Sequence, residues 1–121
     1  MKFGFEDLEV WKKAVDFAND VIDVSENLDT GRKHFRLIEQ LEASSTSIAM
    51  NIAEGKGRYS KKEFIQFLYI ARGSLYETVT LLSIFEKRSW IPKNNFEDLL
   101  GKAIEVAMMI TGLINSIKKS L

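Results

Sequence analysis

The chain has 121 residues, the length of one domain, and its 17 basic residues are balanced by 17 acidic ones. The balanced charge argues against a strong non-specific hold on nucleic acid. The absence of cysteine excludes disulfides, thiolate catalysis and cysteine-based zinc sites. No apolar run approaches the roughly 20 residues of a membrane span, and the first six residues lack the apolar core of a secretory signal. We therefore expect a cytoplasmic protein with no membrane partner.

The first half of the chain predicts two amphipathic helices. The first covers about residues 7–27, with a core stripe of Leu8, Trp11, Val15, Ala18 and Ile22. The second covers about residues 33–54, with a core stripe of Leu37, Ile38, Leu41, Ser45, Ile48 and Ile52. Its middle, residues 43–49, is rich in small side chains that let a neighbouring backbone approach closely. Gly55 stands where a left-handed C-terminal cap is expected.

The second half predicts two more helices. Ser60 followed by Glu63 is a capping box that begins the third helix. Its core stripe comprises Phe64, Phe67, Leu68, Ala71, Leu75, Thr78, Leu82 and Phe85. After a turn over residues 88–95 with the only proline, the fourth helix is expected to begin at Asn95 as its N-cap. Its core stripe comprises Leu99, Ala103, Val106, Ile110, Leu113 and Ile117.

Four such helices with short connections predict one all-α domain over residues 1–121, an antiparallel up-and-down four-helix bundle. No segment alternates with period two, so no strand is expected. The third and fourth helices carry more apolar positions than one core face uses. The interpretation we favour is a subunit interface, with scattered surface residues as the alternative. The candidate interface residues are Ile65, Tyr69, Tyr76, Leu100, Ile104 and Met108.

Catalytic motifs are missing from the sequence. Di-metal four-helix bundles require a glutamate three residues before a histidine. The single histidine, His34, has no such glutamate and is expected at the surface. We therefore predict no enzymatic activity, no metal or other cofactor and no small-molecule substrate. One enzymatic alternative is an all-α, Mg²⁺-dependent nucleotide pyrophosphatase, because hard cations prefer oxygen ligands. Its ligands would come from Asp16, Asp20, Asp23, Glu39 and Glu42, but a matching pair of carboxylates on a later helix is missing.

Charge is distributed unevenly along the chain. Residues 1–30 have a net charge of −5 and residues 31–72 a net charge of +4. The basic residues of the middle cluster around the turn between the second and third helices. The candidate nucleic-acid-binding residues are Lys56, Arg58, Tyr59, Lys61 and Lys62, with the tyrosine available to stack on an unpaired base. The alternative is a solvated basic turn.

Three blocks of sequence carry a family resemblance. They are residues 5–14 (FEDLEVWKKA), residues 40–58 with NIAEG at 51–55, and residues 63–77 with ARGSL at 71–75. Together they resemble the four-helix-bundle proteins encoded within intervening sequences of 23S ribosomal RNA genes. The resemblance implies a ring, as a homopentamer, no established enzymatic activity and an association with RNA.

Five residues of the matching blocks are interpreted as structural: Asn51, Glu54, Gly55, Arg72 and Gly73. Glu54 and Arg72 are expected to form an ion pair that holds the second and third helices in register. The chain departs from the family pattern at Glu42 and Ala43, where basic residues are common, and at Ala49-Met50, where Pro-Ser is frequent. Fewer cations weaken binding to phosphates.

The sequence thus predicts a homo-oligomeric binding or scaffold protein with nucleic acid as its preferred partner. A pure protein-interaction scaffold is the first alternative and the hydrolase is the second.

Overall fold

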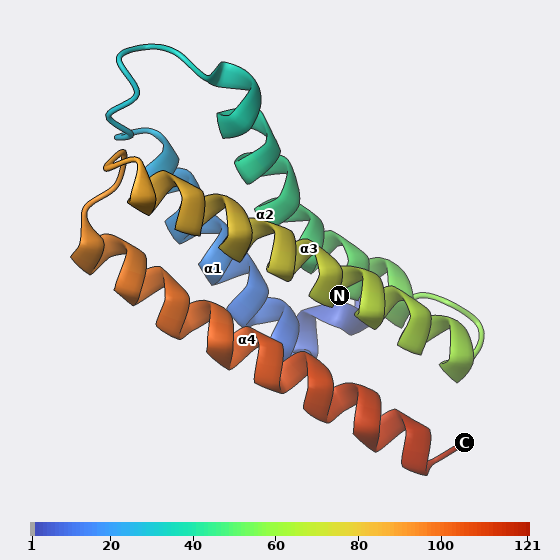
Figure 1. The fold of residues 1–121 in the computed structure, drawn as a ribbon. Coiled ribbons are helices and arrows are strands. Elements are labelled where there is room, and N and C mark those ends of the chain that lie inside the picture. Colours follow the sequence, from blue (N-terminus) through green and yellow to red (C-terminus); the bar gives the residue numbers. More distant parts are fainter. Residues whose placement is uncertain (1) are drawn as a thin grey trace.

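A computed structural model describes residues 2–121. A short 3-10 helix, η1 (Gly4–Asp7), precedes four α-helices: α1 (Glu9–Ser25), α2 (Phe35–Lys56), α3 (Lys61–Lys87) and α4 (Lys93–Lys119). Each helix packs against the next and α4 returns to α1, which closes an antiparallel bundle (Figure 1). The prediction of an all-α four-helix bundle is confirmed, and residues 2–121 contain no strand.

The core lies along the centre of the bundle and comes from all four helices. In α2, α3 and α4 its centre follows the predicted stripes, with Leu41, Ile48, Leu75, Phe85 and Ile110 almost fully buried. In α1 the predicted stripe was partly wrong, because Val15 is 38% exposed while Val10, Ala14, Phe17 and Val21 are buried. The helix carries apolar residues on two adjacent stripes, and packing selects the one that buries Phe17, its largest aliphatic or aromatic core side chain.

Hydroxyl groups join α2 to α3 inside the bundle. The Thr78 hydroxyl donates to Ser44 Oγ at 2.8 Å, and Ser47 Oγ lies 2.9 Å from Ser74 Oγ. Every buried side-chain nitrogen or oxygen in residues 2–121 has a hydrogen-bond partner, as burial of polar groups requires. The small residues of α2 therefore do what their size predicts: they bring the two helices close together.

The start of α3 follows the predicted cap in part. Ser60 Oγ accepts a hydrogen bond from the Glu63 backbone N–H at 3.1 Å. The Glu63 carboxylate accepts from the same hydroxyl, also at 3.1 Å, instead of from the Ser60 backbone N–H. One orphan N–H of the helix is thereby satisfied, and the helix begins where the capping box predicts.

The start of α4 was predicted wrongly. Its N-cap is Pro92, with φ −65° and ψ 149°, and not Asn95. The turn between α3 and α4 is short because it closes at the end of α3. Ser89 takes a left-handed φ of 61°, and the Trp90 N–H donates to the Phe85 carbonyl at 2.9 Å. The Trp90 ring then packs 5.1 Å from Phe85. This is the Schellman motif with its usual apolar contact. Pro92 follows two residues after Trp90 and is the N-cap of α4.

The two loops at this end of the bundle contact each other. His34 is exposed, as predicted, in a left-handed conformation with φ 66°. Its ring lies 4.6 Å from that of Trp90, and the Asp29 N–H donates to the Trp90 carbonyl at 3.1 Å. The α2–α3 turn lies at the opposite end, together with the C-terminus of α4 (Figure 1).

Candidate nucleic-acid interface

The α2–α3 turn is shaped by a close approach at Gly55. We expected a left-handed cap there, but Gly55 is buried inside α2, and the helix ends at Lys56 with Gly57 as its C-cap, at a right-handed φ of −80°. A Cβ at Gly55 would lie 2.6 Å from Phe67 Cβ and 3.3 Å from the Phe64 carbonyl oxygen. Glycine is therefore needed for helix packing and not for its left-handed conformation.

The five predicted binding residues all lie exposed at this turn. Arg58 is the most constrained, with Nη2 at 2.6 Å from Glu54 Oε1 and its guanidinium 4.7 Å from the Phe67 ring centroid. Lys56 Nζ lies 5.9 Å from the Phe64 ring centroid. By contrast, Tyr59 is fully exposed, and Lys62 makes no ion pair or hydrogen bond within residues 2–121.

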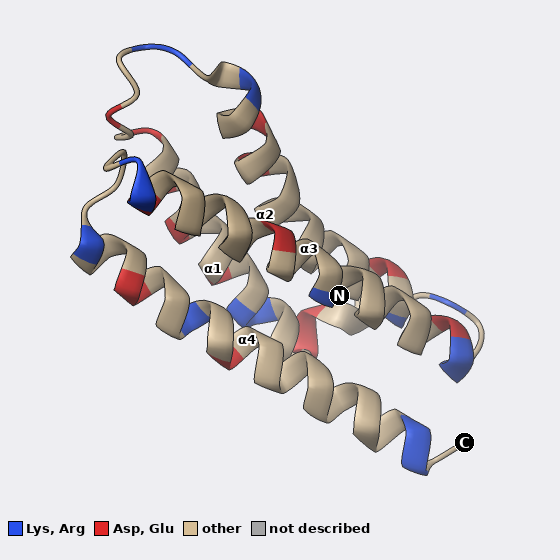
Figure 2. Ribbon diagram, viewed as in Figure 1, with Lys and Arg blue, Asp and Glu red and all other residues tan. Residues whose placement is uncertain are grey.

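The structure adds two lysines that we did not include. Lys61 Nζ donates to the Ser120 carbonyl at 3.3 Å and to its hydroxyl at 3.1 Å, so the end of α4 lies beside the start of α3. Lys118 and Lys119, in the last turn of α4, therefore lie at the same end of the bundle as the α2–α3 turn (Figure 2). An antiparallel bundle always places the start of the third helix and the end of the fourth at the same end. The predicted topology was therefore enough to place Lys118 and Lys119 near the turn. We call this surface the basic end: Lys56, Arg58, Lys61, Lys62, Lys118 and Lys119.

The predicted Glu54–Arg72 ion pair does not form. Glu54 pairs instead with Arg58, four residues later and just past the end of α2. Arg72 donates to Thr111 Oγ1 at 3.2 Å, linking α3 to α4. Its guanidinium lies 4.9 Å from the Tyr69 ring centroid and 5.9 Å from that of Tyr76. Arg72 therefore links α3 to α4 and lies beside two surface tyrosines.

The other two motif residues have different environments. Asn51 Nδ2 donates to the Ser47 carbonyl at 2.8 Å and to Ser47 Oγ at 2.9 Å, which continues the hydroxyl contacts between α2 and α3. A Cβ at Gly73 would meet nothing within 4 Å. No contact within the subunit explains a glycine at that exposed position.

Most of the candidate interface residues form one exposed strip. Tyr76, Ile104 and Met108 are 56%, 53% and 70% exposed, and Tyr69 and the half-buried Leu100 lie beside them. Between α3 and α4 the strip contains a groove of about 320 Å³ lined by Tyr76, Val79, Leu100 and Ile104 among others. We call the strip the α3–α4 face: Tyr69, Tyr76, Leu100, Ile104 and Met108.

Ile65 corrects the predicted interface. It is only 7% exposed and belongs to the core, because it lies on the edge of α3 that turns toward the other helices. At the other margin of the face, Lys118 Nζ donates to the Tyr69 hydroxyl at 2.7 Å. This hydrogen bond, together with the charges of Lys118 and Arg72, lowers the pKa of Tyr69. The margin connects the α3–α4 face to the basic end.

A family model described as 23S rRNA-intervening sequence protein matches residues 6–112. The chain belongs to this family. The crystal structure of a protein of unknown function, from the S23 ribosomal protein family of Bacteroides thetaiotaomicron, is similar to it with a TM-score of 0.81. The two share 27% sequence identity, and the alignment covers 87% of this chain and 97% of that chain. No curated protein matches the chain. The resemblance inferred from the three sequence blocks is thus confirmed.

In this member of the 23S rRNA-intervening sequence protein family, two of the five carboxylates considered for a hydrolase, Asp20 and Glu42, have protein partners. Lys102 Nζ lies 2.7 Å from Asp20 Oδ2 and 3.2 Å from Asp98 Oδ2, and these hydrogen bonds raise the pKa of Lys102. Glu42 accepts a hydrogen bond from Ser25 at 3.0 Å. Residues 2–121 contain no group of three or more His, Cys, Asp or Glu that could hold a metal ion.

Helix α4 qualifies one expectation from the sequence. It alone among the helices of residues 2–121 is long and apolar enough, by length and composition, to cross a membrane. The core helix of a bundle passes the same test, and α4, which packs against α1 and α3, buries Leu99, Ala103, Val106, Ile110 and Ile114. These contacts account for part of its apolar character, and the exposed Ile104 and Met108 belong to the α3–α4 face.

Proposed function

We propose that the protein is a non-enzymatic, homo-oligomeric binding protein whose basic end contacts the phosphates of RNA. The observation that carries the proposal is that the α2–α3 turn, with the exposed Tyr59, lies beside the end of α4, so that the cations of both segments are at one end of the bundle. Residues 55–62 contain four cations and no acidic residue. RNA is the preferred class because the family is described by an rRNA intervening sequence.

Electrostatics at the turn favours a binding role. Lys61 and Lys62 occupy the first turn of α3, where the helix dipole disfavours positive charge. Glu63 is the only residue of that turn whose charge the dipole favours. At the opposite end of the bundle, cations such as Arg32 and Lys87 alternate with Asp29 and Glu86. The basic end is therefore the better surface for an anionic chain.

An exposed apolar face supports the self-association that the proposal includes. The α3–α4 face exposes aromatic and aliphatic side chains around a groove, as subunit interfaces do. In a closed ring each copy would present one basic end, and several weak contacts to one RNA would gain affinity through effective concentration. A pure protein scaffold would use the same face but would leave the basic end without a ligand.

The test is fluorescence anisotropy with a labelled single-stranded RNA at increasing salt. If about three phosphates are neutralised, affinity should fall about 20-fold for each fourfold rise in salt, from a slope of about −0.7 per phosphate. The double variant Lys62→Glu/Lys119→Glu should abolish binding. Neither lysine has an ion-pair or hydrogen-bond partner within residues 2–121, so the fold and the sedimentation behaviour should not change.

The matched control is Lys87→Glu/Lys93→Glu at the opposite bundle end. Each double variant reverses the charge of one lysine in the first turn of a helix and of one lysine at the last position of a helix. In the control these are Lys93 of α4 and Lys87 of α3. The control should bind RNA like the wild type. RNA binding absent at low salt, or lost equally in both double variants, would leave the protein scaffold as the better function.

A further inference from the structure

The N-terminal segment presents a ladder of aromatic rings. Trp11 is half-buried on α1, and the Phe5 ring packs 5.2 Å from it. The Phe3 ring stacks on Phe5 at 5.5 Å with the planes only 5° apart. Phe3 is 71% exposed. The ladder therefore runs from the bundle surface into solvent and ends in a ring that is covered on one face by Phe5.

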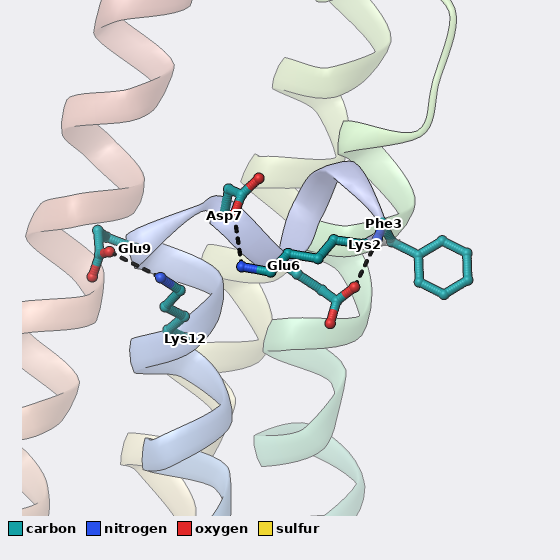
Figure 3. Close-up of polar contacts among 6 residues, drawn as sticks. All are labelled: Lys2, Phe3, Glu6, Asp7, Glu9 and Lys12. Carbon is teal, nitrogen blue, oxygen red and sulfur yellow. Dashed lines mark hydrogen bonds and ion pairs between the residues drawn. The ribbon is translucent and has the colours of Figure 1, made fainter.

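Backbone contacts hold the outer ring in place. The Phe3 N–H donates to Glu6 Oε2 at 2.7 Å (Figure 3), and the Glu6 N–H donates to the Phe3 carbonyl at 3.1 Å. Lys2 Nζ lies 3.6 Å from Asp7 Oδ1 across the same turn. Figure 3 shows the Phe3 side chain pointing away from the helices. The hydrogen bonds of η1 thus fix the backbone of Phe3, and its ring is held by stacking on Phe5.

The ladder lies next to the basic end. A Cβ on Gly4 would be 3.9 Å from Lys56 Cε. Phe5, Met50, Glu54 and Arg58 line one groove of about 470 Å³ where η1 meets the end of α2. A polymer that places a phosphate on Arg58 therefore has Phe5 in the same groove, and Phe3 stacks on Phe5.

We propose that Phe3 is a stacking platform for an unpaired nucleobase, so that the ligand of the basic end is single-stranded RNA and not a duplex. The inference rests on the proposed function. Two observations favour this occupant over an apolar peptide: Lys56 of the basic end lies against η1, where it can contact a phosphate, and the outermost surface is a single planar ring. A base in a duplex has both faces covered by its neighbours, whereas an unpaired base offers a face to an aromatic side chain.

The test compares labelled single-stranded RNA with a duplex of the same length in anisotropy titrations. Phe3→Ala should bind the single strand about 5- to 150-fold more weakly, the range for loss of one base–aromatic stack, and should change duplex binding less than twofold. Phe3→Trp should restore the single-strand affinity because it restores a stacking surface. Phe35→Ala is the matched control, since Phe35 is 63% exposed at the other end of the bundle, and it should have no effect.

The outcomes separate this inference from the proposed function. If Lys62→Glu/Lys119→Glu abolishes binding while Phe3→Ala binds the single strand like the wild type, the stacking platform is wrong and the RNA interface stands. Equal losses for single strand and duplex in Phe3→Ala, or no rescue by Phe3→Trp, would also overturn the platform by showing a structural role. No binding of either RNA at low salt would overturn both.

Discussion

Gly55 and Phe67 meet so closely that a single added carbon on Gly55 would lie 2.6 Å from the Phe67 Cβ. Real Cβ atoms do not approach one another at such a distance, so α2 and α3 could not keep their present separation. The contact sits one residue before the end of α2 and directly under the basic turn. The geometry of the candidate interface therefore depends on a residue that cannot itself bind anything.

Gly55→Ala should destabilise the protein. Over-packing a tight contact costs about 1–3 kcal/mol, which exceeds the gain of up to about 1 kcal/mol from alanine's helix propensity. Gly112→Ala is the control, because a Cβ there would meet nothing within 4 Å. That variant should be about 0.5–1 kcal/mol more stable than the wild type. Urea denaturation measures both, and Gly55→Ala at or above wild-type stability would contradict the packing argument.

The α3–α4 face should mediate self-association. Sedimentation equilibrium should give a multiple of the 13.8 kDa chain mass, and we expect a fivefold multiple. Tyr76→Glu and Ile104→Glu each place a charge in the apolar strip and should lower the assembly state without loss of helicity. Val15→Glu, also at an exposed apolar position but on α1, should assemble normally. A monomeric wild type would remove the subunit interface from the proposal.

The Lys102–Asp20 pair should make stability depend on alkaline pH. The folded-state pKa of Lys102 is raised above its ordinary 10.5, so its contribution is complete below that value and is lost as pH rises through the folded pKa. Both side chains are at least one-third exposed, so the contribution should be less than about 1 kcal/mol. Thermal melts of the wild type and Lys102→Met should therefore differ at neutral pH and converge at strongly alkaline pH. Parallel curves across that range would contradict the linkage.

The helices of this protein could be predicted because their signals are local. Ser60 caps α3 through a backbone contact three residues away, and the apolar periodicity of α2 to α4 depends only on helix geometry. The resemblance to the family also rests on contiguous blocks. Pro92 shows the limit even of local signals, since the start of α4 is set by how Trp90 closes the preceding turn.

The side-chain partners could not be predicted as well. Glu54 had two arginines within plausible reach, and its choice of Arg58 over Arg72 depends on how α2 and α3 are rotated against each other. Ile65 and Tyr69 lie only about 40° apart on a helix wheel, yet one is in the core and the other is at the surface. Sequence periodicity locates a face but not its edge.

Tyr69 offers a second measure of assembly that is independent of mass. In the single subunit its pKa is lowered from 10.0, chiefly by the hydrogen bond from Lys118, which stabilises the phenolate. The stability linked to this shift is absent at neutral pH, appears as pH rises through the lowered pKa, and is complete above 10.0. Burial acts in the opposite direction, because removing the phenolate from water raises its pKa.

The ultraviolet titration of Tyr69, taken as the difference between each protein and its Tyr69→Phe counterpart, should therefore depend on assembly. The variant Ile104→Gln/Met108→Gln should weaken assembly without adding a charge. In this variant the midpoint of the Tyr69 titration should lie below 10.0. Adding Lys118→Met should raise that midpoint, because it removes the hydrogen-bond donor to the Tyr69 hydroxyl. In the assembled wild type, a second copy covering the α3–α4 face should shift the midpoint upward relative to that variant. Identical midpoints in the assembled and disassembled proteins would place Tyr69 outside the interface. The strip that joins subunits would then be limited to Tyr76, Leu100, Ile104 and Met108, and the Lys118–Tyr69 contact would belong to the basic end alone.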